Sequence, residues 1–323
     1  MNKILKIFGL LLIGIIGIVL VAVIYINTSF PNVEIDESFR AELTDVNLER
    51  GKYLVESVTA CFHCHSNVDF SKFSGEIVAG TEGGGGRMYT EADGFPGKFY
   101  ASNITPHALK EWSDAEIYRS ITGGVSKDGD PLFPLMPYAS YRYLTMEDSK
   151  SIVAYLRTLN PIEKEYEESE FGFPFSMILK TIPTNPSPTK KIEIENSVDY
   201  GRYLTKIAGC ESCHTPSVEG EKIEGMDFAG GFEFPVETGG VCRASNITPD
   251  VETGIGGWSK EQFIARFRYY QNNDSILVNQ GEFNSEMPWK VYATMTEKDL
   301  GAIYDFLRTV KPVRNEVARF SMN

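Results

Sequence analysis

Two short stretches of the chain combine paired thiols with a trailing imidazole. The first reads CFHCH from Cys61 to His65, and the second reads CESCH from Cys210 to His214. A redox dithiol would not require the histidine, and a four-sulfur zinc site would leave both histidines without a role. Covalent haem attachment uses every repeated residue, because the thiols add to the porphyrin vinyl groups and the histidine ligates the iron. The sequence therefore predicts two haem c groups, with Cys61, Cys64, Cys210 and Cys213 as the attachment points and His65 and His214 as axial ligands.

Both stretches lie within a longer internal repeat, in which matching positions are separated by 143 to 151 residues. GKYL or GRYL precedes each stretch, and ASNITP, Trp-Ser, Met-Pro and LRT follow in the same order. These matches begin at Gly51 and Gly201, Ala101 and Ala244, Trp112 and Trp258, Met136 and Met287, and Leu156 and Leu307. An Ala-Gly pair is also matched at Ala79 and Ala229. Extra glycines at 83–86 are interpreted as a flexible surface insertion.

A haem iron held by histidine has one axial position left, and the group that fills it decides the chemistry. Met136 and Met287 are the methionines that align with each other in the repeat, and proline follows each of them. We therefore predict that they are the second axial ligands, which would close the iron and favour electron transfer. Met146 and Met295 near the closing helices are expected to be core residues.

Three further residues could bind a metal but lack a partner in the other repeat. His63 aligns with Ser212 and is expected to be partly exposed, and His107 aligns with Asp250. Cys242 is a possible thiolate ligand in principle, yet its alignment with Phe99 favours a buried apolar position.

Helical periodicity supplies the elements that must position these residues. Residues 47–58 and 198–208 are predicted to be helices that lead into each CxxCH stretch. Each repeat is predicted to close with an amphipathic helix, because apolar residues at i, i+3, i+4 and i+7 start at Ile152 and Ile303. The predicted fold class is mainly α, with two tandem cytochrome c domains behind one N-terminal transmembrane helix.

The first thirty residues differ from the rest of the chain. The twenty residues from Ile7 to Ile26 carry no charge, which is enough for a helix to cross about 30 Å of hydrocarbon. Lys3 and Lys6 precede this segment, so the positive-inside rule predicts a cytoplasmic N-terminus and exported haem domains. An uncleaved anchor is favoured over a signal peptide, because the apolar stretch is long and no small-residue cleavage site follows it.

The net charge indicates the kind of partner, and the positions of the repeats indicate how the chain divides into domains. Without the two lysines before the anchor, 29 basic residues remain against 44 acidic ones, a net charge of −15, which favours a basic protein partner and excludes nucleic acid. The aromatic and proline-rich connector is expected to pack across the domain boundary. The predicted divisions are an anchor at 1–28, a linker at 29–46, the first haem domain at 47–160, the connector at 161–196 and the second haem domain at 197–316.

From residue 47 to residue 313, this order of motifs resembles the multihaem cytochrome c subunits of bacterial membrane-bound alcohol, aldehyde and gluconate dehydrogenases. The resemblance implies an electron carrier with His65/Met136 and His214/Met287 as axial pairs. Those subunits generally carry three haem domains, receive electrons from a flavin or quinoprotein partner and pass them to quinone or another carrier. Two haem motifs and an N-terminal anchor distinguish this chain.

The expected function is that of a periplasmic dihaem cytochrome c, held in the inner membrane by a single helix. It would carry electrons between a dehydrogenase or another respiratory donor and a downstream acceptor such as a terminal oxidase, without catalytic activity of its own. The alternative is a dihaem enzyme, either a peroxidase or a sulfur-compound dehydrogenase in which Cys242 ligates one haem. Both enzymes predict that the two haem sites differ in ligation.

Overall fold

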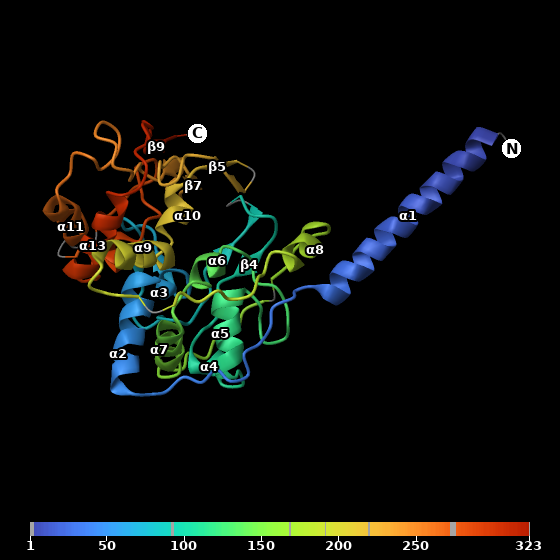
Figure 1. The fold of residues 1–323 in the computed structure, drawn as a ribbon, viewed down its shortest axis with the longest axis horizontal. Coiled ribbons are helices and arrows are strands. Elements are labelled where there is room, and N and C mark those ends of the chain that lie inside the picture. The colour runs from blue at the N-terminus through green and yellow to red at the C-terminus, as the bar shows by residue number, and fades with distance from the viewer. Residues whose placement is uncertain are drawn as a thin grey trace.

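The computed structural model describes residues 3–91, 94–167, 169–190, 192–218, 220–271 and 276–322. It consists of a body rich in short helices, from which one long helix projects (Figure 1). This helix, α1 (Lys3–Ser29), has 27 residues and no buried side chain. Within the described part of the chain it is the one helix long and apolar enough to cross a membrane. The mainly helical prediction is confirmed.

The described part of the first repeat contains three helices of 9 to 11 residues, several shorter helices and two small antiparallel sheets. Its helices are α2 (Asp45–Tyr53), the π-helix η1 (Leu54–Val58), α3 (Cys61–Cys64), α4 (Pro106–Leu109), α5 (Asp114–Gly123), α6 (Tyr138–Tyr141) and α7 (Met146–Leu156). Its strands are β1 (Val68–Asp69), β2 (Glu76–Ile77), β3 (Met88–Tyr89) and β4 (Phe99–Tyr100), paired β1 with β2 and β3 with β4.

The second repeat contains counterparts of α2, α3, α5, α6 and α7, and a larger sheet. After the connector helix α8 (Phe175–Lys180), its helices are α9 (Ser197–Ile207), α10 (Cys210–His214), α11 (Lys260–Arg268), α12 (Trp289–Tyr292) and α13 (Glu297–Leu307). Its strands are β5 (Ser217–Val218), β6 (Glu221–Lys222), β7 (Glu233–Pro235), β8 (Val241–Arg243) and β9 (Phe320–Ser321). Strand β5 pairs with β6, and β7, β8 and β9 form one antiparallel sheet.

A glycine at the same place in each repeat lets two helices cross at close range. A Cβ atom on Gly51 of α2 would lie 1.9 Å from the Ser151 carbonyl oxygen of α7. A Cβ atom on Gly201 of α9 would lie 1.8 Å from the Ala302 carbonyl oxygen of α13. Any side chain at these positions would force the helices apart. The recurrence of GKYL and GRYL is therefore explained by equivalent helix crossings.

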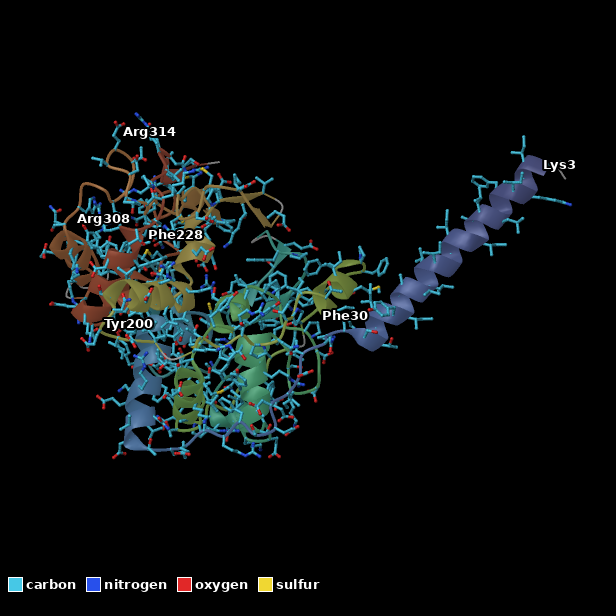
Figure 2. All side chains as sticks on the ribbon, in the orientation of Figure 1. Lys3, Phe30, Tyr200, Phe228, Arg308 and Arg314 are labelled. Carbon is cyan, nitrogen blue, oxygen red and sulfur yellow. The ribbon has the colours of Figure 1, made fainter. Side chains whose placement is uncertain are left out.

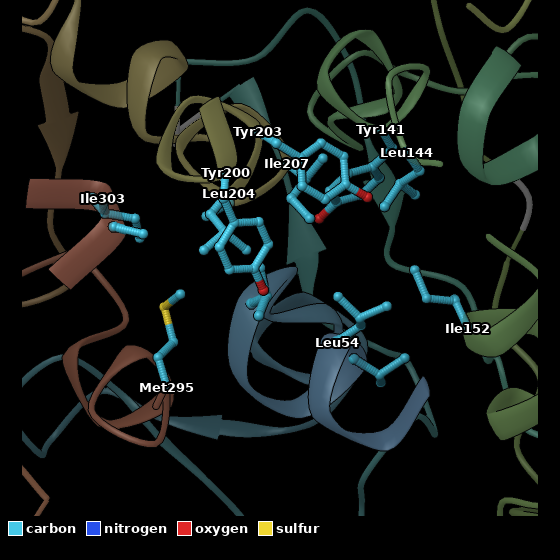
Figure 3. Close-up of a cluster of buried hydrophobic side chains, with 14 of the residues drawn as sticks. Leu54, Tyr141, Leu144, Ile152, Tyr200, Tyr203, Leu204, Ile207, Met295 and Ile303 are labelled. Atoms are coloured by element: carbon cyan, nitrogen blue, oxygen red, sulfur yellow. The ribbon is translucent and has the colours of Figure 1, made fainter. Parts of the chain in front are cut away.

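The apolar core continues from one repeat into the other. Figure 3 shows Leu54 of the first repeat with Ile152 on one side of it and Tyr200 and Leu204 of the second repeat on the other. All four side chains belong to one cluster of buried residues. Burial of this shared surface stabilises the two repeats against each other, because removing apolar area from water is favourable wherever it occurs along the chain.

One tyrosine of each repeat is hydrogen-bonded to the start of the closing helix of the other repeat. The Tyr53 hydroxyl donates to Asp299 (2.7 Å) and accepts from the Thr296 N–H (3.0 Å) at the start of α13. The Tyr203 hydroxyl donates to Asp148 (2.6 Å) and accepts from the Thr145 N–H (3.1 Å) at the start of α7. Each hydroxyl thus satisfies a helix N-terminus and a buried carboxylate across the interface.

The connector packs against the first repeat. From the sequence it was expected to pack across the boundary between the two repeats. Phe171 and Phe175 lie against Phe133 of the first repeat, with ring centroids 5.5 and 5.9 Å apart. At its other end, Lys180 donates to Asn27 near the end of α1 (2.7 Å). Figure 1 shows α8 between the body and α1, and Figure 2 labels Phe30 just beyond this end of α1. The connector therefore links the first repeat to the long helix.

The glycine run 83–86 is not the flexible surface insertion that its composition predicts. Gly83, Gly84 and Gly85 are buried, and a Cβ atom on Gly84 would lie 3.1 Å from the Ile162 side chain. This part of the chain passes between the first CxxCH stretch and the start of the connector. Glycine is required there by close packing, rather than by mobility.

Candidate functional site

A single large cavity joins the two repeats. Its volume is about 2180 Å³, more than twice the roughly 1,000 Å³ upper end of ordinary small-ligand sites. Every residue predicted to attach or ligate haem lines this one cavity: Cys61, Cys64, His65, Met136, Cys210, Cys213, His214 and Met287. The structure thus brings the two sets of predicted site residues to a common space.

Each CxxCH stretch begins a short helix after a residue in the left-handed conformation. Ala60 has φ +51° before α3, and Gly209 has φ +71° before α10. The left-handed backbone at these residues turns the chain out of the preceding helix, η1 or α9, and into the short CxxCH helix. Within the helical turn, the two cysteines of each stretch lie one turn apart. All five cysteines are free thiols in the structure.

The same hydrogen bond orients both candidate proximal histidines. Nδ1 of His65 lies 2.7 Å from the Ser102 carbonyl oxygen, and Nδ1 of His214 lies 2.7 Å from the Ser245 carbonyl oxygen. A carbonyl oxygen can only accept, so Nδ1 must carry the proton and donate. In a neutral imidazole, Nε2 is then left with its lone pair for a metal, as in most histidine-ligated metal sites.

The environment also keeps these imidazoles neutral. Burial lowers the pKa of His65 and of His214, and the carbonyl of Ser102 or Ser245 only partly opposes this effect. A histidine must be unprotonated at the ligating nitrogen to bind a metal ion. Tautomer and protonation state therefore both match the form required of an iron ligand.

The ASNITP strings hold the serine carbonyls in place. In the first repeat, the Asn103 side chain accepts from the Thr105 N–H (2.9 Å) and hydroxyl (2.7 Å), and it donates to the Ile162 carbonyl (2.8 Å). In the second repeat, Asn246 makes the same bonds to Thr248 and donates to the Val313 carbonyl (2.8 Å). The recurrence of ASNITP was visible in the sequence, but its role in orienting the histidine was not.

Two glycines complete the histidine support and correct the sequence alignment. Gly85 donates its N–H to the His65 carbonyl (2.8 Å), and Gly230 does the same to His214 (2.7 Å). Both have positive φ, and a Cβ atom on either would lie 2.5–2.6 Å from the backbone nitrogen of the ASNITP asparagine. The counterpart of Gly230 is therefore Gly85, and the proposed match with Gly80 is wrong, because the insertion hid the true register.

The Met-Pro pairs occupy equivalent backbone positions. The Met136 carbonyl accepts from the Tyr138 N–H (2.7 Å), and the Met287 carbonyl accepts from the Trp289 N–H (2.8 Å). Pro137 and Pro288 are the N-caps of α6 and α12. Each methionine side chain is partly buried against the core and also lines the cavity. Met295 is only 1% exposed and belongs to the core, as predicted.

A tyrosine at the end of α6 or α12 ties the methionine segment to the CxxCH segment. The Tyr141 hydroxyl donates to the Thr59 carbonyl and the Tyr292 hydroxyl donates to the Ala208 carbonyl, both at 2.7 Å. Thr59 and Ala208 lie two residues before the first cysteine of their repeat. Burial raises the pKa of both tyrosines, so they remain neutral donors. The sequence had identified these tyrosines as recurrent without assigning them a role.

His63 is buried, in contrast to the expected partial exposure. It is 6% exposed, lines the cavity, and neither of its ring nitrogens has a hydrogen-bond partner. Burial, together with the positive charge of Arg87, lowers its pKa to about 3. His63 is therefore a neutral side chain in the cavity wall. His107 lines the same cavity.

An ion pair crosses from one repeat to the other at the cavity wall. Arg87 Nη2 lies 3.2 Å from Glu286 Oε2, and both side chains are 19% exposed. Arg87 also lies over the rings of Phe70 (4.6 Å) and Tyr89 (5.1 Å). Its backbone counterpart in the second repeat is Phe232, because each precedes the strand that begins the β-hairpin. The cavity wall thus differs between the repeats.

Cys242 has the position that its alignment with Phe99 predicted. It lies in β8 opposite Phe234, as Phe99 lies in β4 opposite Tyr89. The side chain is buried and reaches the cavity wall. Burial raises its pKa to about 11, so the side chain is a thiol at neutral pH.

The cavity and its donors fit haem c better than the other two chemistries considered. Among the residues that the structure describes, no three His, Cys, Asp or Glu side chains gather closely enough to hold a metal ion, so a four-sulfur zinc cage is not favoured. A redox dithiol would not explain two equivalent histidines whose Nδ1 is hydrogen-bonded to a backbone carbonyl. A largely apolar cavity with one such histidine, two thiols and one methionine per repeat matches the needs of haem c.

Comparison with known proteins gives the same class. The chain is similar to cytochrome c subunits of dehydrogenases and to a diheme cytochrome c. It is 28% identical to the fructose dehydrogenase cytochrome subunit of Gluconobacter japonicus over 276 residues, which cover 82% of this chain and 52% of that protein. It is 26% identical to the gluconate 2-dehydrogenase cytochrome c subunit of Pantoea cypripedii over 287 residues, covering 83% and 60%.

A shorter match involves a dihaem protein. The diheme cytochrome c-type protein of Cereibacter sphaeroides is 28% identical over 165 residues, which cover 48% of this chain and 53% of that protein. The chain spans little more than half the length of the dehydrogenase subunits that it matches. No family model matches the sequence. The predicted resemblance to dehydrogenase cytochrome subunits is confirmed.

Proposed function

We propose that this protein is a membrane-anchored dihaem cytochrome c that carries electrons between a dehydrogenase and a downstream acceptor. Each repeat would hold one haem, through Cys61 and Cys64 in the first and through Cys210 and Cys213 in the second. When bound, haem supplies reversible one-electron chemistry at its iron. The remaining contributions belong to the protein: attachment, axial ligation, and a largely apolar cavity.

The observation that carries this proposal is the duplicated histidine support facing one cavity. His65 and His214 are held by the same bond of 2.7 Å to the serine of ASNITP, and both line the cavity. A single haem would need only one such arrangement. Two arrangements that open on a shared cavity support two haems close enough to exchange electrons.

The thiols support the same conclusion. Cys64 and Cys213, the second attachment cysteines of the two repeats, both line the shared cavity, so both attachment sites open on the same space.

Met136 and Met287 are proposed as the second axial ligands. Both line the cavity next to a proline N-cap, and Tyr141 and Tyr292 tie their segments to the CxxCH segments. Methionine ligation closes the iron to small molecules and favours electron transfer over peroxide chemistry. Because Arg87 lines one wall and Phe232 the other, we expect the two haems to have unequal reduction potentials.

The proposed location is the periplasmic face of a bacterial inner membrane, with α1 as a single span and the N-terminus in the cytoplasm. Support comes from the length and exposure of α1 and from the lysines that precede its apolar stretch. The proposed electron donor is a dehydrogenase subunit, because the similar proteins are cytochrome subunits of dehydrogenases. The acidic body favours a basic docking surface on a partner.

Haem content tests this proposal directly. The full-length chain, expressed with a c-type maturation system, should contain two covalently bound haems per polypeptide by pyridine haemochrome assay and intact mass. Cys210→Ala with Cys213→Ala should leave one haem, which would be the haem of the first repeat. Retention of no covalent haem by the unmodified chain would refute the proposal. A redox titration in which both haems titrate with the same midpoint potential would refute the expected difference between the haems.

A further inference from the structure

The connector carries an exposed apolar surface close to the end of α1. Phe173 is 76% exposed and Ile178 is 52% exposed, whereas Phe171 and Phe175 of the same segment are partly buried. Leu179 on the other side of α8 is 2% exposed and anchors the helix to the protein. Large apolar side chains held outward by a fixed backbone indicate a surface that is covered in the working protein.

The position of this surface is tied to that of the long helix. Helix α8 contacts α1, and Lys180 donates to Asn27, which follows the last residue of the uncharged apolar stretch. A helix of 27 residues is about 40 Å long, against a hydrocarbon thickness of about 30 Å, so its last turn lies among the lipid headgroups. The bond to Asn27 therefore sets α8 at headgroup depth.

Further contacts hold the body in this orientation. The chain that leaves α1 donates from the Glu34 N–H to Asn185 of the connector (2.8 Å). Phe39 then stacks on Tyr118 of α5 with ring centroids 4.4 Å apart, and it is buried. The long helix and the first repeat are thus joined at several points, rather than by a free linker.

We propose that residues 171–180 form a second membrane contact, in which Phe173 and Ile178 insert into the headgroup–acyl boundary of the outer leaflet. This inference rests on the proposed role of α1 as a membrane span. The segment has the composition of an interfacial anchor: aromatic and aliphatic side chains face outward, and one lysine lies beside them. The occupant is the lipid surface, because α1 enters it at the point where α8 is attached.

The same segment reaches the cavity of the first repeat. Phe171 stacks on Phe133, which packs on Phe99 at 4.3 Å, and all three line the cavity. Membrane contact by the connector would hold the first repeat next to the bilayer and the second repeat farther from it. Figure 1 agrees with this order, since the helices of the second repeat lie on the far side of the body from α1.

Site-directed spin labelling of the haem-loaded full-length chain tests the inference. Nitroxide labels would be attached one at a time to Phe173→Cys, Ile178→Cys, Val251→Cys and Ile16→Cys in a Cys242→Ala background. Val251 is the matched control, because it is an apolar residue with 74% exposure in the second repeat. The chain would be reconstituted into vesicles of phosphatidylcholine and phosphatidylglycerol, and the relaxation of each label by oxygen and by a water-soluble nickel chelate would be measured.

The proposal predicts that labels at 173 and 178 lose accessibility to nickel and gain accessibility to oxygen relative to the label at 251. If the label at 16 lies in the hydrocarbon while those at 173 and 178 behave like the label at 251, the membrane contact is refuted and the anchor stands. The exposed residues would then be available to a protein partner. If the label at 16 is also in water, the proposed anchor and the inference resting on it both fail.

Discussion

The two repeats support their histidines identically but differ in the wall beside them. His65 and His214 share the bond to an ASNITP serine and the same glycine contact. The wall next to the first repeat contains Arg87, whereas the second has Phe232 at the equivalent backbone position. Duplication has therefore preserved the geometry of the ligand and not the electrostatics around it.

The interface between the repeats likewise contains equivalent residues with different surroundings. Asp148 and Asp299 are both buried, and each accepts a bond from a tyrosine of the other repeat. Asp148 also pairs with Arg50 at 2.8 Å, while Asp299 receives a second tyrosine, Tyr200, at 3.3 Å. One carboxylate is thus neutralised by a cation, and the other is only hydrogen-bonded. This difference predicts unequal responses to equivalent substitutions.

The largest effect is expected from the glycines beneath the histidines. Gly85→Ala and Gly230→Ala should each destabilise the protein by about 3 kcal/mol or more, because the new Cβ atom meets backbone atoms at a positive φ. Denaturant unfolding and haem content would be measured together. Gly80→Ala is the control, since its φ is +83° but nothing lies within 4 Å of the added Cβ atom. Equal effects at 80 and 85 would contradict the assigned equivalence of Gly85 and Gly230.

The arginines of the two LRT strings should differ sharply although their sequence context is the same. Arg157 pairs with Asp114 (2.9 Å) and also donates to the carbonyls of Leu109 and Trp112. Arg157→Ala should cost about 2–3 kcal/mol, because it leaves Asp114 without this partner. Arg308 is exposed and donates to the Gly256 carbonyl (2.8 Å), so Arg308→Ala should cost less than about 1 kcal/mol. Urea denaturation of both variants would measure the difference, and comparable losses would show that the repeats are more alike than described.

The reciprocal tyrosines allow a finer comparison. Tyr203→Phe should lower the free energy of unfolding by about 2 kcal/mol, because the buried Thr145 N–H loses its partner and Asp148 keeps only the bond from Arg50. Tyr53→Phe should cost about 1 kcal/mol, since Asp299 keeps the bond from Tyr200 and water can reach the Thr296 N–H. Chemical denaturation followed by circular dichroism measures both. A larger loss for Tyr53→Phe would reverse the predicted order.

The free energy of unfolding at alkaline pH should also report on Tyr203. Burial, followed by the Asp148 carboxylate, raises the pKa of Tyr203 above its ordinary value of 10.0. The unfolded chain loses this proton near pH 10 while the folded protein keeps it, so the contribution to stability is present below pH 10 and falls as the pH rises. Between pH 9 and pH 11, unmodified protein should lose about 1.4 kcal/mol more than Tyr203→Phe. Denaturant midpoints at both pH values test this, and parallel losses would contradict it.

The sequence predicted the elements that follow from local pattern. The helices before each CxxCH stretch were predicted within a few residues, and each closing helix was predicted in the region of α7 or α13, because helical periodicity is a local pattern. The equivalence of Cys242 and Phe99 was also correct, since short strands with a fixed register preserve alignment. The match to dehydrogenase cytochrome subunits followed from the order of the motifs.

Features that depend on long-range packing were missed. Glycine-rich composition at 83–86 indicates mobility only when no neighbour needs the space, and here Ile162 and Asn103 do. His63 was expected to be partly exposed because its position is not repeated, but its ring lies 6.1 Å from the ring of Phe70 and lines the cavity wall. The connector was placed across the boundary because nothing in its sequence indicates that Phe133 is its partner. One-dimensional patterns do not record which surface a residue faces.

The central claim is that each repeat ligates one haem with histidine and methionine. The most direct measurement is the optical and low-temperature EPR spectrum of the oxidised, haem-loaded chain, beside Met136→Ala and Met287→Ala. The account predicts two low-spin histidine/methionine centres, a weak band near roughly 695 nm, and partial loss of that band in each variant. A high-spin or thiolate-ligated haem in the unmodified protein, or a variant with an unchanged spectrum, would contradict it.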